Sequence, residues 1–132
     1  MSGSDVLDGR IFDMVSSTAS VVSGVAPTRF RYSERDGVVW GEYRGDTVTE
    51  GRFCGSRDGD ELRVAFVHRS TTGALVSGEA TSTISREADG RLLLTEDFAG
   101  ADGSPQVSVC REILDGGGDA VRKRDGRARR GA

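Results

Sequence analysis

Few side chains in this sequence could do acid–base or ligand-binding chemistry, and the most informative ones lie within runs of alternating polarity. The single histidine, His68, ends one such run, while Glu96 lies within a second run and Arg111 within a third. An imidazole and a carboxyl group can donate and accept protons, and a guanidinium can pair with an anionic group. These three residues are therefore the first candidates for a site.

Alternation predicts which of these groups face the interior, because successive residues of a strand point to opposite faces. Leu62, Val64 and Phe66 share a face with His68. Since an apolar face packs inward, this pattern predicts that His68 also points inward, near one end of a barrel.

The same argument applies to Glu96, which shares a face with Leu92, Leu94 and Phe98. The apolar neighbours on this face predict that the Glu96 carboxyl points inward. Burying such a group costs free energy unless it is paired or hydrogen-bonded.

In the last alternating run, Val107 and Val109 share a face with Arg111. This arrangement predicts that Arg111 lies inside and Cys110 outside. Because the strands of Glu96 and Arg111 follow one another in the chain, the sequence also predicts an inward ion pair between them. Arg111 would then be available to an acidic group on a guest.

For the hairpin predicted over residues 38–55, the sequence does not decide which face points inward. Its two faces are Val38, Trp40 and Glu42 on one side and Val39, Gly41 and Tyr43 on the other. Trp40, the only tryptophan, favours the first set inside, which would bring Glu42 inward. A bulge at Gly41 would instead send Tyr43 inward.

These arguments yield one candidate cluster with two interpretations. The predicted ligand-binding residues are Trp40, Glu42, Tyr43, Phe66, His68, Glu96 and Arg111. They either line a ligand cavity, in which a few polar groups orient an apolar guest, or form a satisfied polar network or a solvated rim. Cys54 shares a face with arginine and glutamate, which predicts that it points outward and is not a catalytic nucleophile.

The elements that position these residues are predicted by regularly spaced turns. Gly and Asp occur together between the alternating runs, at residues 36–37, 45–46, 58–59, 89–90 and 102–103. About eight strands result, at the spacing typical of all-β domains. Short connections favour antiparallel pairing of sequential strands, and closure into a barrel removes exposed edges. We therefore predict an all-β, up-and-down barrel.

Composition divides the chain into three predicted segments: a flexible N-terminus over residues 1–9, the barrel over residues 10–114, and a disordered basic tail over residues 115–132. The tail holds six basic and three acidic residues, and the remaining 114 residues hold 12 basic and 18 acidic ones. The acidic charge of this body predicts that the folded domain does not bind nucleic acid.

Several classes of site are excluded by the motifs that the sequence lacks. One histidine and two separated cysteines do not form a metal site or a disulfide framework. No phosphate-binding or dinucleotide-binding glycine motif occurs, so no cofactor is expected. With no apolar leader or membrane-spanning run visible, we expect a cytoplasmic protein that does not bind membranes.

Residues 30–112 carry a family resemblance. The matching segments are FRYSERDGVVWGEYRGD (30–46), GRFCG (51–55), FVH (66–68), ATSTI (80–84) and RLLLTEDF (91–98). This stretch resembles a group of short bacterial proteins that are often labelled N-acetylglutamate synthase. The resemblance implies a small all-β, barrel-like fold. N-Acetyltransferases that use acetyl-CoA have a mixed α/β fold with a glycine-containing turn before a helix, and this sequence offers neither feature.

Three functions follow as hypotheses. The leading one is a calycin-like barrel that binds a small, partly apolar organic molecule in its interior. The second is an enzyme in the same cavity, an isomerase, lyase or cyclase, with His68 or Glu96 as the acid–base group. The third is a non-catalytic interaction module that pairs through an exposed strand edge. A homodimer is a possible assembly.

Overall fold

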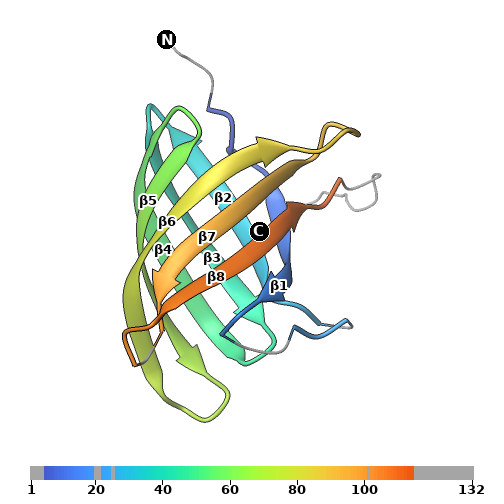
Figure 1. Ribbon diagram of the computed structural model, residues 1–132. Helices are drawn as coiled ribbons and strands as arrows, with labels where there is room; N and C mark the ends of the chain where they lie inside the picture. Colours follow the sequence, from blue (N-terminus) through green and yellow to red (C-terminus); the bar gives the residue numbers. More distant parts are fainter. Residues whose placement is uncertain (1–4, 20–21, 25, 101, 115–132) are drawn as a thin grey trace, which may run out of the picture.

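The computed structural model of the chain is an eight-stranded closed barrel without helices (Figure 1), and it describes residues 5–19, 22–24, 26–100 and 102–114. The strands are β1 (Ile11–Ser17), β2 (Arg29–Arg35), β3 (Val38–Gly45), β4 (Val48–Asp58), β5 (Glu61–Ser70), β6 (Leu75–Arg86), β7 (Leu92–Ala99) and β8 (Pro105–Glu112). None of the described residues forms a helix that is long and apolar enough to cross a membrane.

Every strand pairs antiparallel with its neighbour in the chain, and β8 pairs back with β1 to close the barrel. The predicted all-β, up-and-down, calycin-like barrel is thereby confirmed. Because each described strand has a neighbour on both sides, the barrel offers no free strand edge. The hypothesis of pairing through an exposed edge is therefore wrong.

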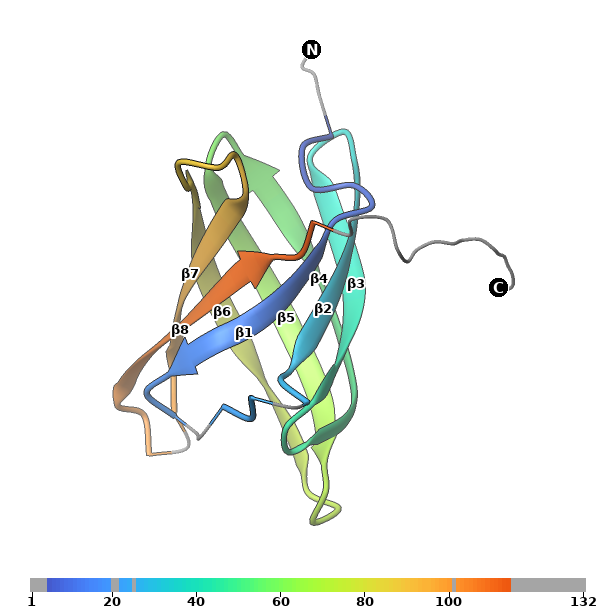
Figure 2. The ribbon, with the colours of Figure 1, turned by 90° about the vertical axis from the view of Figure 1, so that its right-hand side faces the viewer.

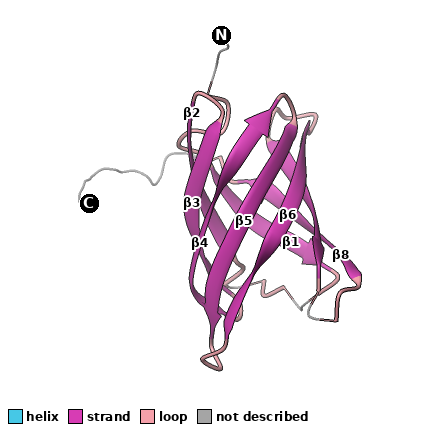
Figure 3. Ribbon diagram, turned by 90° about the vertical axis from the view of Figure 1, so that its left-hand side faces the viewer, coloured by secondary structure: helices cyan, strands magenta, loops and turns pink. Residues whose placement is uncertain are grey.

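Tight turns connect the strands where the sequence predicts them, as Figure 3 shows. Asp36 and Gly37 form the two-residue link between β2 and β3, with φ angles of 51° and 83°. Positive φ at both central positions matches the right-handed twist of the flanking strands. The Gly45–Asp46 turn between β3 and β4 also has positive φ at both residues.

The two ends of the barrel differ. One end, the closed end, is covered by residues 5–10, just before β1, where the Leu7 side chain has no exposed surface. The predicted flexible N-terminus is therefore wrong for residues 5–9, and the fold begins before residue 10. Residues 1–4 and the predicted tail, residues 115–132, lie outside the described residues.

The opposite end, the open end, carries the β3–β4 and β5–β6 turns, and the connection from β1 to β2 passes along it in Figure 2. The half of the interior near the closed end holds a cluster of buried apolar side chains, Phe12, Val39, Leu62, Ile84, Leu92 and Leu94. Polar groups and aromatic rings dominate the half near the open end.

Candidate functional site

A cavity of about 340 Å³ occupies the half of the barrel near the open end. Its apolar walls include Phe30, Tyr32, Phe53, Phe66 and Phe98. Its polar groups include Tyr43, His68, Glu96 and Ser108, and its mouth is formed at the ends of strands by Ser17, Thr28, Asp46 and Gly100. The predicted residues Tyr43, Phe66, His68 and Glu96 thus lie in one cavity, while Trp40, Glu42 and Arg111 do not.

Tyr43 and His68 form a hydrogen-bonded pair, with 2.8 Å between the phenol oxygen and the imidazole Nδ1. Burial raises the pKa of Tyr43 far above its usual value, and burial lowers the pKa of His68. The phenol therefore keeps its proton and the imidazole is neutral, so the pair is uncharged near neutral pH. Either the phenol or the imidazole donates this hydrogen bond, depending on which ring nitrogen of His68 carries the proton.

Gly51 makes this pair possible. It lies on β4 directly between Tyr43 on β3 and His68 on β5. A Cβ atom at Gly51 would come within 2.6 Å of the Tyr43 ring, so the ring lies across bare backbone. Without a side chain at this position, the phenol crosses β4 and reaches the imidazole.

Gly41 has the same role in the neighbouring row of side chains. It separates Tyr32 on β2 from Phe53 on β4, whose ring centroids are 4.6 Å apart. A Cβ atom at Gly41 would meet the Phe53 ring at 2.6 Å and the Arg31 carbonyl oxygen at 2.0 Å. Pairing runs through Gly41 without a bulge, and Tyr43 reaches the interior by simple alternation. A bulge at Gly41, one of the two alternatives that the sequence left open, is therefore not present.

Glu96 lies on β7 in a row of inward polar side chains. Ser82 on β6 and Ser108 on β8 are its direct neighbours in the two ladders. Its carboxyl makes one hydrogen bond within the described residues, accepted from the Ser82 hydroxyl at 3.5 Å. Burial raises the pKa of Glu96 to about 7, and the Ser82 hydrogen bond opposes that rise.

Among the described lining residues, none places a fixed positive charge opposite this carboxyl. The described residues that line the cavity include no lysine or arginine, and the His68 imidazole is neutral. Burial also raises the pKa values of Tyr32 and Cys110, so both stay protonated. The cavity therefore holds one buried acid, several neutral hydrogen-bonding groups and an aromatic wall.

Arg111 points outward, which contradicts the prediction. Its side chain is 39% exposed and its Nε lies 2.9 Å from Glu87. Cys110, predicted outside, is buried at 1% exposure. The inward face of β8 is small and polar, with Ser108 and Cys110, while Val107 is exposed on the outer face. The apolar face of this strand is thus the outer one, and Arg111 cannot pair with Glu96 or with a guest inside.

Trp40 and Glu42 also point outward. Trp40 is 43% exposed, and Glu42 lies 3.6 Å from Arg52 on the surface. Tyr43 and Val39 occupy the inward positions of β3, which resolves the open choice between Glu42 and Tyr43. Cys54 is exposed, as predicted. Within the described residues, no group of three or more potential ligands could hold a metal ion.

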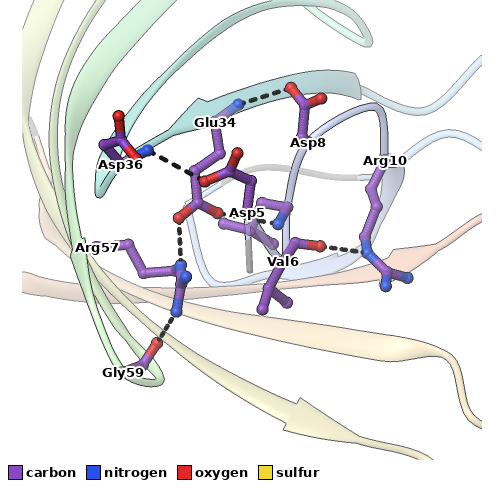
Figure 4. A network of polar contacts seen from close by, with 9 residues as sticks. Asp5, Val6, Asp8, Arg10, Glu34, Asp36, Arg57 and Gly59 are labelled. Atoms are coloured by element: carbon purple, nitrogen blue, oxygen red, sulfur yellow. Dashed lines mark hydrogen bonds and ion pairs between the residues drawn. The ribbon is translucent and has the colours of Figure 1, made fainter. Parts of the chain in front are cut away.

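Two acids at the closed end were not singled out in the sequence. Figure 4 shows Glu34 next to the N-terminal turn and bonded to Arg57. Its carboxyl accepts hydrogen bonds from the Leu7 amide at 3.0 Å and from the Arg57 Nε at 2.7 Å. Glu112 accepts from Arg10 at 2.7 Å and from the Leu92 amide at 3.1 Å. Glu34 shares a face with the inward residues of β2, so alternation alone could have found it.

Comparisons with known proteins give one match. A family model described as "Avidin-like protein" matches residues 6–113. No curated protein and no solved structure matches the chain significantly. The matched range begins inside the N-terminal turn and ends just after β8, so it includes both the closed end and the cavity.

Proposed function

The chain belongs to the avidin-like protein family, and we propose that its barrel binds a small, partly apolar organic molecule in the cavity at the open end. The observation that carries this proposal is the contrast within the interior. One half is filled by side chains, while the other holds a cavity of about 340 Å³ that reaches the mouth.

The composition of the cavity wall supports the proposal. Ligand sites are concave, mostly apolar, and contain a few placed polar groups. Here Phe30, Phe53 and Phe66 supply aromatic surface, and the Tyr43–His68 pair and Glu96 supply hydrogen-bonding atoms. The volume lies in the lower part of the range of roughly 300–1,000 Å³ that small-molecule sites occupy.

A fluorescent probe tests binding in the lumen. N-Phenyl-1-naphthylamine is a small aromatic dye whose emission rises when it leaves water for an apolar site. We expect saturable enhancement of its emission with the native protein. The variant Ala80→Trp, which places an indole inside the cavity, should abolish this enhancement because Ala80 lines the lumen.

Ala65→Trp is the matched control. Ala65 lies on the neighbouring strand but points outward, so the same substitution there should leave dye binding unchanged. Equal dye binding by the native protein and by folded Ala80→Trp would show that the dye sits on the outer surface. That result, or no saturable binding at all, would contradict the proposed function.

An enzyme in the same cavity is a second candidate, supported by one observation. A buried carboxyl group whose pKa is raised to about 7 can both donate and accept a proton at neutral pH. If Glu96 acts as a base for isomerisation, it should catalyse exchange of the α-protons of 1-indanone in deuterated buffer. Proton NMR would show exchange above background that is lost in Glu96→Gln, and a background rate would contradict the candidate.

Location and assembly are proposed on sequence grounds. We propose a cytoplasmic location, which suits the two unpaired thiols, one exposed and one buried. A homodimer is proposed only as a possible assembly. Cell fractionation and light scattering would test the two, and a periplasmic pool or a strictly monomeric mass would contradict them.

A further inference from the structure

We propose that the guest carries a protonated nitrogen base, an amine or amidine head group, whose N–H groups bind the Glu96 carboxylate. This inference rests on the proposed function and names the class of molecule that the cavity accepts. It follows from the charges on the cavity wall and from the unused hydrogen-bonding capacity of Glu96.

The first step concerns hydrogen bonds. An ionised carboxylate offers about four lone-pair directions, and buried acceptors in folded proteins are normally satisfied. Among the described residues, Glu96 accepts a single long hydrogen bond, from Ser82. The two neighbouring inward side chains, Ser82 and Ser108, are small, so the carboxyl faces the cavity without a large side chain beside it in its row. A guest with several N–H donors would satisfy the remaining lone pairs.

The second step concerns charge. The described lining contains no lysine or arginine, and Glu96 and Asp46 are its acids. The Asp46 carboxylate at the mouth already accepts from the Thr28 amide and hydroxyl and from the Ser23 amide. An anionic guest would meet no countercharge on this lining and would be repelled by ionised Glu96. A cationic guest would supply the partner that the lining does not provide.

Two other buried glutamates of the barrel show what kind of partner Glu96 lacks among the described lining residues. Glu34 and Glu112 are each bound by an arginine side chain and a backbone amide. A guanidinium presents planar N–H groups to a carboxylate, and an amidine on a guest presents the same geometry. In the cavity, the guest would thus pair with Glu96 in the way that an arginine pairs with each glutamate at the closed end.

The pH dependence of binding follows from the groups around Glu96. Tyr32, Tyr43 and Cys110 face it and stay neutral, because burial raises their pKa values. His68, on β5 two strands away, has a lowered pKa and gains charge only in acid. A cationic guest should therefore bind more tightly as pH rises through the pKa of Glu96, about 7.

Three probes of nearly the same shape test the inference: benzamidine, benzamide and benzoate, which are cationic, neutral and anionic at pH 8. Binding is followed by saturation-transfer NMR with displacement of N-phenyl-1-naphthylamine. We expect benzamidine to bind at least about tenfold more tightly than benzamide, and benzoate to bind weakest. Benzamidine should bind at least about tenfold more weakly at pH 5.5 than at pH 8, since Glu96 is then protonated.

Glu96→Gln isolates the carboxyl, because the amide keeps the shape and removes the charge. In this variant benzamidine should fall to the affinity of benzamide, and the pH dependence near 7 should vanish. Any dependence that persists, centred below the ordinary pKa of histidine, belongs to His68. The matched control is Glu42→Gln, an outward glutamate, which should leave all three affinities unchanged.

The outcomes separate the inference from the proposed function. If benzamide or benzoate binds as tightly as benzamidine, or if none binds while the dye does, the cationic head group is ruled out and the binding function stands. If neither the dye nor any probe binds in the lumen, the proposed function fails and the inference fails with it. The probe series with the native protein decides the matter even if Glu96→Gln is poorly folded.

Discussion

Both ends of this barrel bury glutamate side chains, but the two ends give them different hydrogen-bond partners. At the closed end, Glu34 and Glu112 each accept hydrogen bonds from an arginine and from a backbone amide. Toward the open end, Glu96 accepts one long hydrogen bond from Ser82 among the described residues. Both arrangements place carboxyl groups out of water, which costs free energy unless they are paired.

The difference separates a structural role from a binding role. The paired acids fasten residues 5–10 across the closed end, so their charges are used within the fold. Glu96 faces a cavity instead of a charged partner, and its carboxyl is available to a molecule that enters. Breaking a paired acid should therefore damage stability, whereas changing Glu96 should alter binding and the pH dependence of stability.

The largest expected effect comes from removing an arginine at the closed end. Arg57→Met would leave the Glu34 carboxylate buried without its countercharge, at a cost of about 3–5 kcal/mol in the free energy of unfolding. Urea denaturation at pH 7 measures this cost. Arg52→Met, on the same strand but in exposed ion pairs, is the control and should cost at most about 1 kcal/mol. Equal losses in both variants would contradict the structural role of Glu34.

The next effect is a pH dependence of stability that has its source in Glu96. Its pKa is raised from 4.5 to about 7 in the folded protein, so the folded state binds the proton more tightly than the unfolded state. This contribution is fully present below about pH 4.5 and is lost as pH rises through about 7, a change of about 3 kcal/mol.

Glu96→Gln should remove that contribution. The difference in unfolding free energy between the variant and the native protein, measured by urea denaturation from about pH 4.5 to about pH 8.5, should therefore change in favour of the variant as pH rises. Parallel pH profiles for the two proteins would show that Glu96 is not held in its neutral form by burial.

A smaller effect is expected from the Tyr43–His68 pair. Tyr43→Phe removes the phenol hydroxyl and leaves the His68 Nδ1 without its hydrogen-bond partner, which should cost about 0.5–1.5 kcal/mol. The ring packing against Phe30, with centroids 4.9 Å apart, would be retained. Thermal unfolding measures the cost, and a histidine NMR titration should report an altered His68 environment. An unchanged His68 titration would contradict the hydrogen bond.

The smallest effect is expected at Arg111. Its ion pair with Glu87 lies on the outer surface, so Arg111→Ala should cost at most about 1 kcal/mol and leave dye binding unchanged. Dye displacement measures binding. A strong loss of binding in a folded variant would indicate that Arg111 faces the interior, and would contradict the described register of β8.

Alternation and turn chemistry are sufficient to predict the fold and some of the site residues. The Asp-Gly pairs place the turns, and the strands β5 and β7 carry enough apolar residues to assign His68 and Glu96 to the interior. The N-terminal turn could not be predicted because Leu7 lies among mostly polar residues, in a stretch without the periodicity of a strand or a helix. Its burial depends on Glu34 and Arg57, which are distant in sequence.

The errors have separate physical causes. The rule that the apolar face points inward holds for β5 and β7, which line the cavity, but it fails for β8. On β8 the small Ser108 faces the cavity, so the preceding residue, Val107, lies on the outer face. On β3, size alone favours an inward Trp40, although large apolar residues also occur on surfaces. The nearby Gly41 and Gly51 carry the better signal, since each makes room for an inward ring.

One measurement tests the central claim most directly. The ¹³C chemical shift of the Glu96 carboxyl carbon, followed from acid to alkaline pH with and without saturating benzamidine, reports the charge of this group inside the barrel. The account predicts a midpoint near 7 for the free protein and a clearly lower midpoint with benzamidine bound, because the cation stabilises the carboxylate. An unchanged midpoint in the presence of bound benzamidine would contradict it.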